Sequence, residues 1–457
     1  MKKSINFLFC LLAATVFSFY SCSDDIEHEE KPEIDNNEDN KDDGEDDGYK
    51  VYPVQLQLVY PAETGVKPAE NVMVTLKNSV NGTIFEDATD AAGLAEFKVP
   101  EGLYEASATD KRVVGPKVLL FNGLNSKVEV NANTGKVELA LEASMGGSIV
   151  IKELYVGGCP KDDGSKSFIE DQYVVLYNNS TEVIDVSDFA FGMVLPFNSS
   201  AKGNKDFQNG KLVYADKKVI PAGVAVWYFN GEIKLEGGKE VVVSMNGAIN
   251  HTTTYSQSVD LSNSEYYAFY DKKNFTHKKY QVSSTIDPSH YLTCFKYGMG
   301  TAWPLSIVSP AFYIFRPEGT DLKAFVDDPA TTDNYGGNAK MPRKMVPESW
   351  IVDAIEVFKE GEEGVKRLLP SVDAGYINFI NGKGYTLYRN VDKEATEAVE
   401  GNKDKLVYNY ALGVEDSTDP SGIDAEASLK NGARIIYMDT NNSTKDFHQR
   451  SKASLRK

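Results

Sequence analysis

Short runs in which apolar and polar residues alternate recur along this sequence, and they constrain its fold more than any other feature. Residues 54–60 are Val-Gln-Leu-Gln-Leu-Val-Tyr, and residues 72–76 alternate in the same way. Successive side chains of a strand point to opposite faces, so this pattern is typical of strands with one buried face. The 25 Tyr and 22 Phe residues also favour strands over helices. We therefore predict a mainly β protein.

Helix signals are few. Residues 321–326 have a helical pattern, with Thr320 or Asp321 as the N-terminal cap. Residues 362–369 have another, which Pro370 would end. We expect one short helix at each place. The sequence contains no internal repeat of the period that solenoids or propellers need.

The composition excludes two classes of protein. Of the 457 residues, 41% are hydrophobic, which is enough to bury a core and excludes global disorder. The chain has 48 basic and 67 acidic residues, so its net charge is −19. Nucleic acids are bound through clusters of Lys and Arg, and we therefore expect no nucleic-acid partner.

The N-terminus has the features of a secretion signal. Two lysines precede an apolar run from Ile5 to Tyr20, which is short for a transmembrane helix. Residues 18–22, Ser-Phe-Tyr-Ser-Cys, resemble a bacterial lipobox, in which small residues precede a Cys that receives lipid. We expect residues 1–21 to be a lipoprotein signal peptide and Cys22 to anchor the protein to the outer membrane. The alternative is an ordinary signal peptide that happens to contain a Cys.

Residues 22–50 predict a disordered acidic tether. Residues 24–48 contain 14 acidic side chains and two Lys, which account for more than half of the net charge of −19. With almost no apolar side chains this segment cannot fold alone. Ser23, Asp24 and Asp25 resemble the export tag of Bacteroidetes lipoproteins, and this resemblance implies that the protein faces the cell exterior.

Residues 51–145 predict a β-sandwich. Residues 80–83, Val-Asn-Gly-Thr, indicate a hairpin turn. In residues 89–104 the alternation places Phe97 and Val99 on the inner face. This segment resembles carboxypeptidase-regulatory-like and related immunoglobulin-like modules. The resemblance implies a fold and no activity, so we expect a spacer between the membrane and the next domain.

Residues 146–457 predict a second, larger β domain. Several segments resemble strands of a lamin-tail-type immunoglobulin fold; they are residues 148–155, 171–180, 350–356 and 433–447, the last of which includes the Asn-rich turn of that fold. The opening and closing strands lie more than 200 residues apart. Long insertions near 195–345 and 360–430 must therefore decorate the sandwich, and loops of this kind commonly provide binding residues.

The order of these segments resembles a Bacteroidetes lipoprotein family known as domain of unknown function 4876. The residues that support the resemblance are Glu153-Leu154-Tyr155, Asp171-Gln172-Tyr173, residues 347–354 (Pro-Glu-Ser-Trp-Ile-Val-Asp-Ala) and residues 439–447. The resemblance implies a lipoprotein, transfers no catalytic residues, and suggests a TonB-dependent transporter as a partner.

Known catalytic and metal-binding motifs are missing from the sequence. The five His residues lack zinc-binding spacing, so His251, His277 and His290 would bind a metal only if the fold brought them together. There is no phosphate-binding loop, dinucleotide fingerprint or nucleophile elbow. An acid pair such as Asp327-Asp328 would serve a glycosidase only at a fixed separation, and solvated surface acids are the simpler interpretation. We expect no metal, no cofactor and no catalysis.

Aromatic clusters are the best candidates for ligand binding. We select Trp227, Tyr266, Tyr267 and Trp303 as a candidate platform. Exposed rings stack on sugars and other planar ligands and anchor protein interfaces. Tyr266 and Tyr267 are neighbours on one strand, so they cannot both point inward. The alternative is that these rings fill the β core.

Two further features concern covalent chemistry. Cys159 and Cys294 lie in a compartment that permits disulfides, and either a bond between them or two free buried thiols fits the sequence. Residues 416–418, Asp-Ser-Thr, match the short tripeptide used for O-glycosylation in Bacteroidetes, which marks Ser417.

We therefore predict a lipid-anchored outer-membrane protein that faces the cell exterior and binds a carbohydrate, another small ligand or a protein partner without catalysis. One alternative is an enzyme that acts on extracellular glycans with carboxylates from the inserted loops. Another is a purely structural or adhesive module. Carboxylates that face each other in a cleft would favour the enzyme, whereas an aromatic platform would favour binding.

Overall fold

The predicted predominance of strands is confirmed in a computed structural model that describes residues 50–114, 117–200, 204–334, 340–362 and 364–457. In these residues the chain forms 27 strands and four short α-helices. None of the described helices has the length and apolar character needed to cross a membrane. The predictions for the signal peptide, Cys22, Ser23, Asp24 and Asp25 concern residues outside the described ranges.

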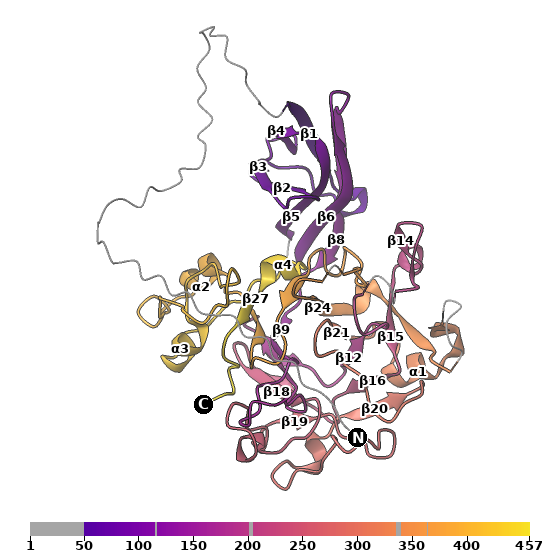
Figure 1. Cartoon of the computed structure of the whole chain (residues 1–457), viewed down its shortest axis with the longest axis vertical. Coiled ribbons are helices and arrows are strands. Elements are labelled where there is room, and N and C mark those ends of the chain that lie inside the picture. The colour runs from indigo at the N-terminus through magenta and orange to yellow at the C-terminus, as the bar shows by residue number, and fades with distance from the viewer. Residues whose placement is uncertain (1–49, 115–116, 201–203, 335–339, 363) are drawn as a thin grey trace, which may run out of the picture. The chain divides into compact units, whose positions relative to one another are not determined.

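The first eight strands form two sheets, with the orders β4-β1-β7 and β3-β2-β5-β6-β8 (Figure 1). The predicted inward residues Phe97 and Val99 are buried between the sheets with Leu56 and Tyr104. The turn at residues 80–83 joins β2 to β3, as predicted. The strand bounds are β1 Val51–Val59, β2 Met73–Asn78, β3 Ile84–Ala88, β4 Leu94–Pro100, β5 Gly102–Val114, β6 Lys117–Val130, β7 Lys136–Ala140 and β8 Glu142–Met145.

The larger region is built on two six-stranded sheets, with the orders β19-β18-β10-β9-β26-β27 and β20-β16-β12-β21-β24-β25. The first sheet contains β9 Ile149–Tyr155, β10 Tyr173–Asn178, β18 Glu240–Ser244, β19 Tyr267–Ala268, β26 Thr386–Arg389 and β27 Phe447–Arg450. The second contains β12 Ala190–Met193, β16 Ala225–Tyr228, β20 Thr293–Lys296, β21 Ala311–Phe315, β24 Ile351–Lys359 and β25 Ile377–Phe379.

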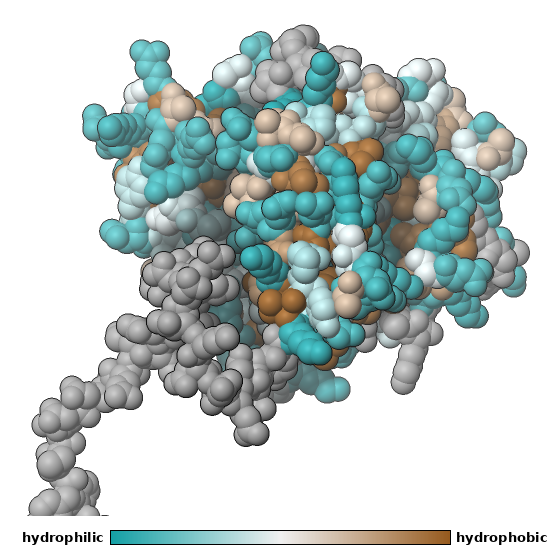
Figure 2. All heavy atoms as spheres, turned by 90° about the horizontal axis from the view of Figure 1, so that it is seen from above, coloured by the Kyte–Doolittle hydropathy of each residue, from teal (hydrophilic) through white to brown (hydrophobic). Residues whose placement is uncertain are grey.

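One hydrophobic core joins these two sheets into a sandwich. Leu154 and Val174 from the first sheet belong to the same buried cluster as Phe312 and Ile355 from the second. A second buried cluster covers the opposite face of the second sheet, where Tyr313 and Val346 pack with the insertions. On the face drawn in Figure 2, hydrophobic residues form separate patches among hydrophilic ones.

The insertions contain three small sheets. Their strands are β11 Ile184–Asp185 with β17 Lys234–Leu235, β13 Phe207–Gln208 with β14 Lys211–Leu212, and β15 Val219–Gly223 with β23 Arg343–Pro347 and β22 Thr332–Asp333. The predicted helix after Asp321 is confirmed as α1 Leu322–Asp327. The Asp321 side chain caps its first turn by accepting a hydrogen bond from the Ala324 backbone N–H. Two helices were not predicted, α2 Lys393–Ala398 and α3 Ala425–Lys430, and both follow an Asp cap.

Two predictions of secondary structure are wrong. Residues 362 and 364–369 form no helix, because the backbone N–H groups of Arg367 and Leu368 donate to the buried carboxylate of Glu356. The closing strand expected in residues 433–447 is confined to β27. The backbone N–H groups of Ile436 and Tyr437 donate to the Thr396 and Asn179 side chains, and α4 Ser443–Asp446 begins at an Asn442 cap. In both places a side chain captures backbone N–H groups that the predicted element would have used.

Candidate ligand-binding site

The two tryptophans that we selected as a platform belong to the core. Trp227 is 0% exposed and Trp303 is 2% exposed. Both rings pack on Phe269, with centroid distances of 5.0 Å for Trp227 and 5.4 Å for Trp303. In β16 the alternation directs Ala225 and Trp227 into the space between the two large sheets. The prediction of an exposed platform is therefore wrong for Trp227 and Trp303.

Tyr266 and Tyr267 are both half-buried and point to different sides, as their adjacency requires. Tyr266 packs on a small buried cluster that includes Val259. Tyr267 packs against the main core, and its ring stacks on His290 at a centroid distance of 4.3 Å. Their participation in ligand binding stays a prediction.

The remaining tryptophan, Trp350, lines an open cavity that the sequence analysis missed. It is half-buried and ends the 3₁₀ helix Glu348–Trp350, immediately before β24. The ring of Phe325 meets it edge-on at a centroid distance of 5.1 Å, and its backbone carbonyl accepts a hydrogen bond of 2.9 Å from the Arg316 N–H. These contacts hold the indole in place. The sequence feature that could have indicated this site is a Trp in a turn, directly after Pro347-Glu348-Ser349.

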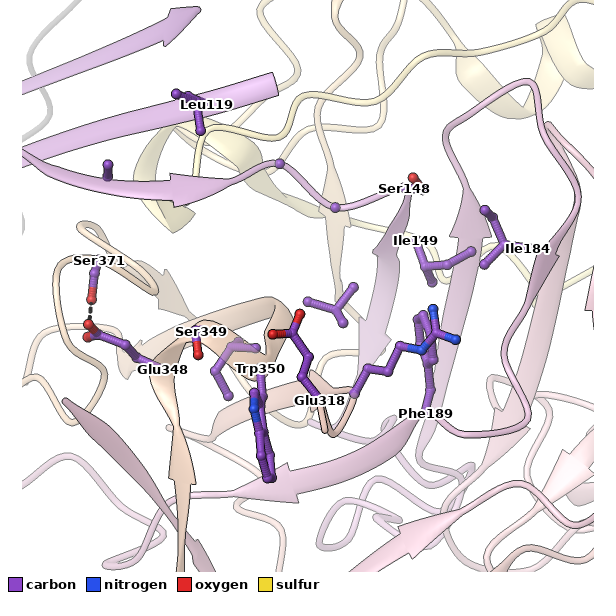
Figure 3. A pocket seen from close by; sticks show the side chains of 16 residues that line it. Leu119, Ser148, Ile149, Ile184, Phe189, Glu318, Glu348, Ser349, Trp350 and Ser371 are labelled. Atoms are coloured by element: carbon purple, nitrogen blue, oxygen red, sulfur yellow. Dashed lines mark hydrogen bonds between the residues drawn. The ribbon is translucent and has the colours of Figure 1, made fainter. Parts of the chain in front are cut away.

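This cavity, the Trp350 cavity, has a volume of about 410 Å³. Its apolar wall includes Leu119, Ile149, Ile184, Phe189, Ile351 and Val352. Figure 3 shows Trp350, Glu318 and Phe189 on one side and Leu119, Ser148 and Ile184 on the other. A mostly apolar wall with a few polar groups at its edge is typical of small-ligand sites.

The charged side chains at the edge of the cavity are Arg316, Glu348 and Glu318. Neighbouring side chains hold the first two in place. The Arg316 Nε lies 2.7 Å from the Asp188 carboxylate, and its guanidinium lies 5.7 Å from the centre of the Phe189 ring. The Glu348 carboxylate accepts a hydrogen bond of 2.7 Å from the Ser371 hydroxyl, which Figure 3 also shows. Glu318 is exposed, and within the described part of the chain its carboxylate has no hydrogen-bond partner.

The two cysteines are buried free thiols, so the disulfide interpretation is wrong. Cys159 lies beside the side chain of Asp171. Cys294 lies in β20, where it pairs with Trp227 of β16. Burial, with the nearby Asp171 charge, raises the pKa of the Cys159 thiol to about 12. Burial also raises the pKa of Cys294. Both thiols are therefore protonated at neutral pH and unreactive.

His251, His277 and His290 belong to no cluster of described residues that could bind a metal. Among the described residues there is no group of three or more His, Cys, Asp or Glu that could hold a metal ion. The His251 Nε2 lies 2.9 Å from the Gly247 carbonyl oxygen, and the His290 ring stacks on Tyr267. These contacts are structural.

Ser417 lines a second cavity, of about 330 Å³, together with Asp416 and His448. This composition resembles a hydrolytic triad, but the hydrogen bonds exclude one. The Nδ1 of His448 lies 2.7 Å from the Asn390 side-chain oxygen, and its Nε2 lies 2.5 Å from the Tyr410 hydroxyl. His448 therefore has no free nitrogen to accept a proton from Ser417. Modification of Ser417 stays a prediction.

Several carboxylates that could act as acids or bases have structural partners instead. Asp327 and Asp328 are exposed, as expected, and Asp328 caps the 3₁₀ helix Pro329–Thr331. Several other acids are buried rather than solvated, which the sequence did not predict; five of them are Glu153, Asp171, Asp353, Glu356 and Asp373. Each of these accepts hydrogen bonds from neighbouring protein groups.

Residues 236–407 match the profile of a family described as protein of unknown function (DUF4876). The predicted resemblance to this family is confirmed. A crystal structure of a DUF4876 family protein from Bacteroides thetaiotaomicron is 20% identical, with a TM-score of 0.50, and the match covers 86% of this chain and 94% of that chain. At this identity the DUF4876 likeness concerns the fold alone.

Two other crystal structures are more distant. A candidate polysaccharide-binding protein (DUF1812) from Bacteroides thetaiotaomicron is 15% identical with a TM-score of 0.16, over 31% of this chain and 56% of that chain. A candidate adhesin from Bacteroides ovatus is 9% identical with a TM-score of 0.18, over 73% of this chain and 94% of that chain. Neither likeness is close enough to support a function for the DUF4876 region. No curated protein matches the sequence.

Proposed function

We propose that this chain is a lipid-anchored outer-membrane protein that faces the cell exterior and binds a ligand in the Trp350 cavity without catalysing a reaction. The observation that supports the proposal most is the half-exposed, firmly packed indole of Trp350 in an open cavity of about 410 Å³. Pockets that combine an apolar wall with a few polar groups bind small molecules or parts of larger ones.

The anchor is inferred from the N-terminal sequence. A Cys at position 22 follows a short apolar run, and Ser23, Asp24 and Asp25 follow the Cys. The acidic segment after them contains almost no apolar side chains and would act as a tether. A TonB-dependent transporter is the partner that the family resemblance suggests.

Binding without catalysis agrees with the carboxylates of the cavity. Glu348 is held by the Ser371 hydroxyl, and the Lys218 ammonium lies 3.5 Å from its second oxygen. The Glu348 carboxylate therefore already has two structural partners, and the Glu318 carboxylate is exposed to solvent.

The proposal is tested with the full chain in detergent and with three classes of probe: neutral polysaccharides, acidic polysaccharides and a tryptic digest of casein. Trp350 is the half-exposed tryptophan, so a ligand in its cavity should protect part of the fluorescence from quenching by acrylamide. We expect protection by at least one probe, its loss in Trp350→Ala, and no shortening of any polymer. The proposal fails if no probe protects Trp350, or if polymers are shortened by the wild type and not by a Glu318→Gln, Glu348→Gln variant.

A further inference from the structure

We infer that the Trp350 cavity, which the proposed function treats as the ligand site, receives a neutral pyranose unit of a glycan. The inference combines the packing of the indole, the hydroxyl and carboxylate groups around it, the charge of the cavity and its size.

The indole of Trp350 is suited to a sugar ring. A pyranose has a face of C–H groups that packs on an aromatic face, while its hydroxyls point outward around the ring. Phe325 supports Trp350 edge-on at 5.1 Å, and Arg316 holds its backbone carbonyl. Because the indole is already ordered, binding a ligand costs little additional side-chain entropy.

The polar edge of the cavity matches the outward hydroxyls of a sugar. Glu318 and Ser349 are exposed beside the indole, and Ser148 lies across the cavity. A carboxylate accepts hydrogen bonds from two neighbouring hydroxyls, and a serine hydroxyl both donates and accepts. A purely apolar ligand would cover these groups without bonding them, which is unfavourable. The cavity therefore favours a ligand that is apolar on one face and rich in hydroxyls at its edge.

The charge of the cavity favours a neutral sugar over an acidic one. Its charged lining residues are Arg316, Glu318 and Glu348. Arg316 is already paired with Asp188 at 2.7 Å, so it offers little to a ligand carboxylate. A uronic acid or a sulfated sugar would meet the exposed Glu318 carboxylate, while Arg316 and the Lys218 beside Glu348 already pair with acids.

The volume restricts how much of a glycan can enter. At about 410 Å³ the cavity lies near the lower end of the range for small-ligand sites, ~300–1,000 Å³. A short part of a glycan fits this volume, such as a chain end or a side branch, and the rest would extend into solvent.

The experiment measures affinities by isothermal calorimetry and by protection of tryptophan fluorescence, with the full chain in detergent. The neutral probes are maltoheptaose, cellohexaose, xylohexaose and mannan fragments; the acidic probe is oligogalacturonate; the peptide probe is digested casein. The variants are Trp350→Ala, Trp350→Phe and Glu318→Gln. Glu232→Gln is the matched control, because Glu232 is an exposed acid that does not line the cavity. Thermal melts of every variant check the fold.

We expect at least one neutral probe to bind, with affinity reduced about tenfold or more in Trp350→Ala and less in Trp350→Phe, which keeps an aromatic face. Glu318→Gln should weaken the neutral probe and strengthen oligogalacturonate, whereas Glu232→Gln should change neither. Two results would overturn the assignment of a neutral sugar: binding of casein peptides alone, or binding of oligogalacturonate as tightly as any neutral probe. Either result would still support the Trp350 cavity as a ligand site. If no probe protects the fluorescence of Trp350 from quenching, the proposal that this cavity is a ligand site is wrong.

Discussion

The carboxylate of Glu356 and the guanidinium of Arg367 form an ion pair of 2.8 Å in which both side chains are fully buried. Glu356 also accepts hydrogen bonds from the backbone N–H groups of Arg367 and Leu368. Arg367 donates to the backbone carbonyls of Pro196 and Ser309. This pair therefore connects β24 to two segments that are distant in sequence, at Pro196 and Ser309, and holds one end of the large insertion on the sandwich.

Breaking this pair should destabilise the protein strongly. Arg367→Met leaves the Glu356 charge buried without its partner, and we expect a loss of about 3–5 kcal/mol in the free energy of unfolding. The measurement is denaturant unfolding followed by circular dichroism. The control is Lys359→Met, which breaks an exposed pair with Glu362 and should cost no more than about 1 kcal/mol. Equal losses in the two variants would contradict the structural role of Arg367.

A buried acid should make stability depend on pH. Burial and the nearby Asp353 charge raise the pKa of Asp439 from 3.8 to about 7, although the Arg389 guanidinium opposes them. An acid whose pKa is raised by folding stabilises the folded state at low pH, and this contribution is lost as the pH rises through the folded value. Asp446 is the other charged group that faces the Asp439 side chain.

Asp439→Asn should therefore become more stable relative to the wild type as the pH rises from 3.8 through about 7. An Asn side-chain oxygen can still accept the hydrogen bond that the Gly147 N–H donates to Asp439. Denaturant unfolding at a series of pH values measures the difference. Glu232→Gln, at an exposed position, should run parallel to the wild type. A constant difference between Asp439→Asn and the wild type would show that Asp439 does not titrate in this range.

The three tryptophans should differ in their effect on stability. Trp227→Ala and Trp303→Ala each remove a buried ring and should cost about 3–5 kcal/mol. Trp350→Ala removes a half-exposed ring and should cost clearly less. Thermal melts of the three variants test this order. Trp350→Ala as destabilising as the other two would mean that Trp350 serves packing rather than a ligand.

The membrane anchor should depend on one residue. Cys22→Ala removes the only side chain to which lipid would be attached, so the variant should be released as a soluble protein or remain uncleaved. Fractionation of cell envelopes in high salt, with immunoblotting, measures the result. Cys294→Ala is the control, because a buried thiol in β20 has no part in anchoring. An outer-membrane fraction of Cys22→Ala as large as that of the wild type would refute the lipoprotein hypothesis.

Surface display should depend on the acidic residues directly after the anchor. Replacing Asp24 and Asp25 with Ala should retain the protein on the periplasmic side of the outer membrane. Protease treatment of intact cells measures the exposed fraction, and lysed cells give the total. Replacing Asp46 and Asp47, further along the same acidic segment, is the matched control and should leave the exposed fraction unchanged. If both replacements behave alike, the export signal is not at residues 24–25.

Local sequence patterns determined the strands and one helix of this protein. The alternation in residues 54–60 and 72–76 predicted β1 and β2, and Asp321 predicted α1, because strand alternation and helix capping depend on neighbours a few residues apart. The resemblance to DUF4876 likewise came from short segments, and it described the fold without a site.

Tertiary structure decided which side chains are buried and where a ligand can bind. Residues 362–369 have a helical pattern, yet Glu356 captures their N–H groups in an interaction that periodicity does not reveal. Trp227 and Trp350 are the same residue type, and only the packing of two sheets buries the first while a turn at a cavity leaves the second half exposed. Burial is set by partners far away in the chain, so the sequence by itself predicted the strands and not the site.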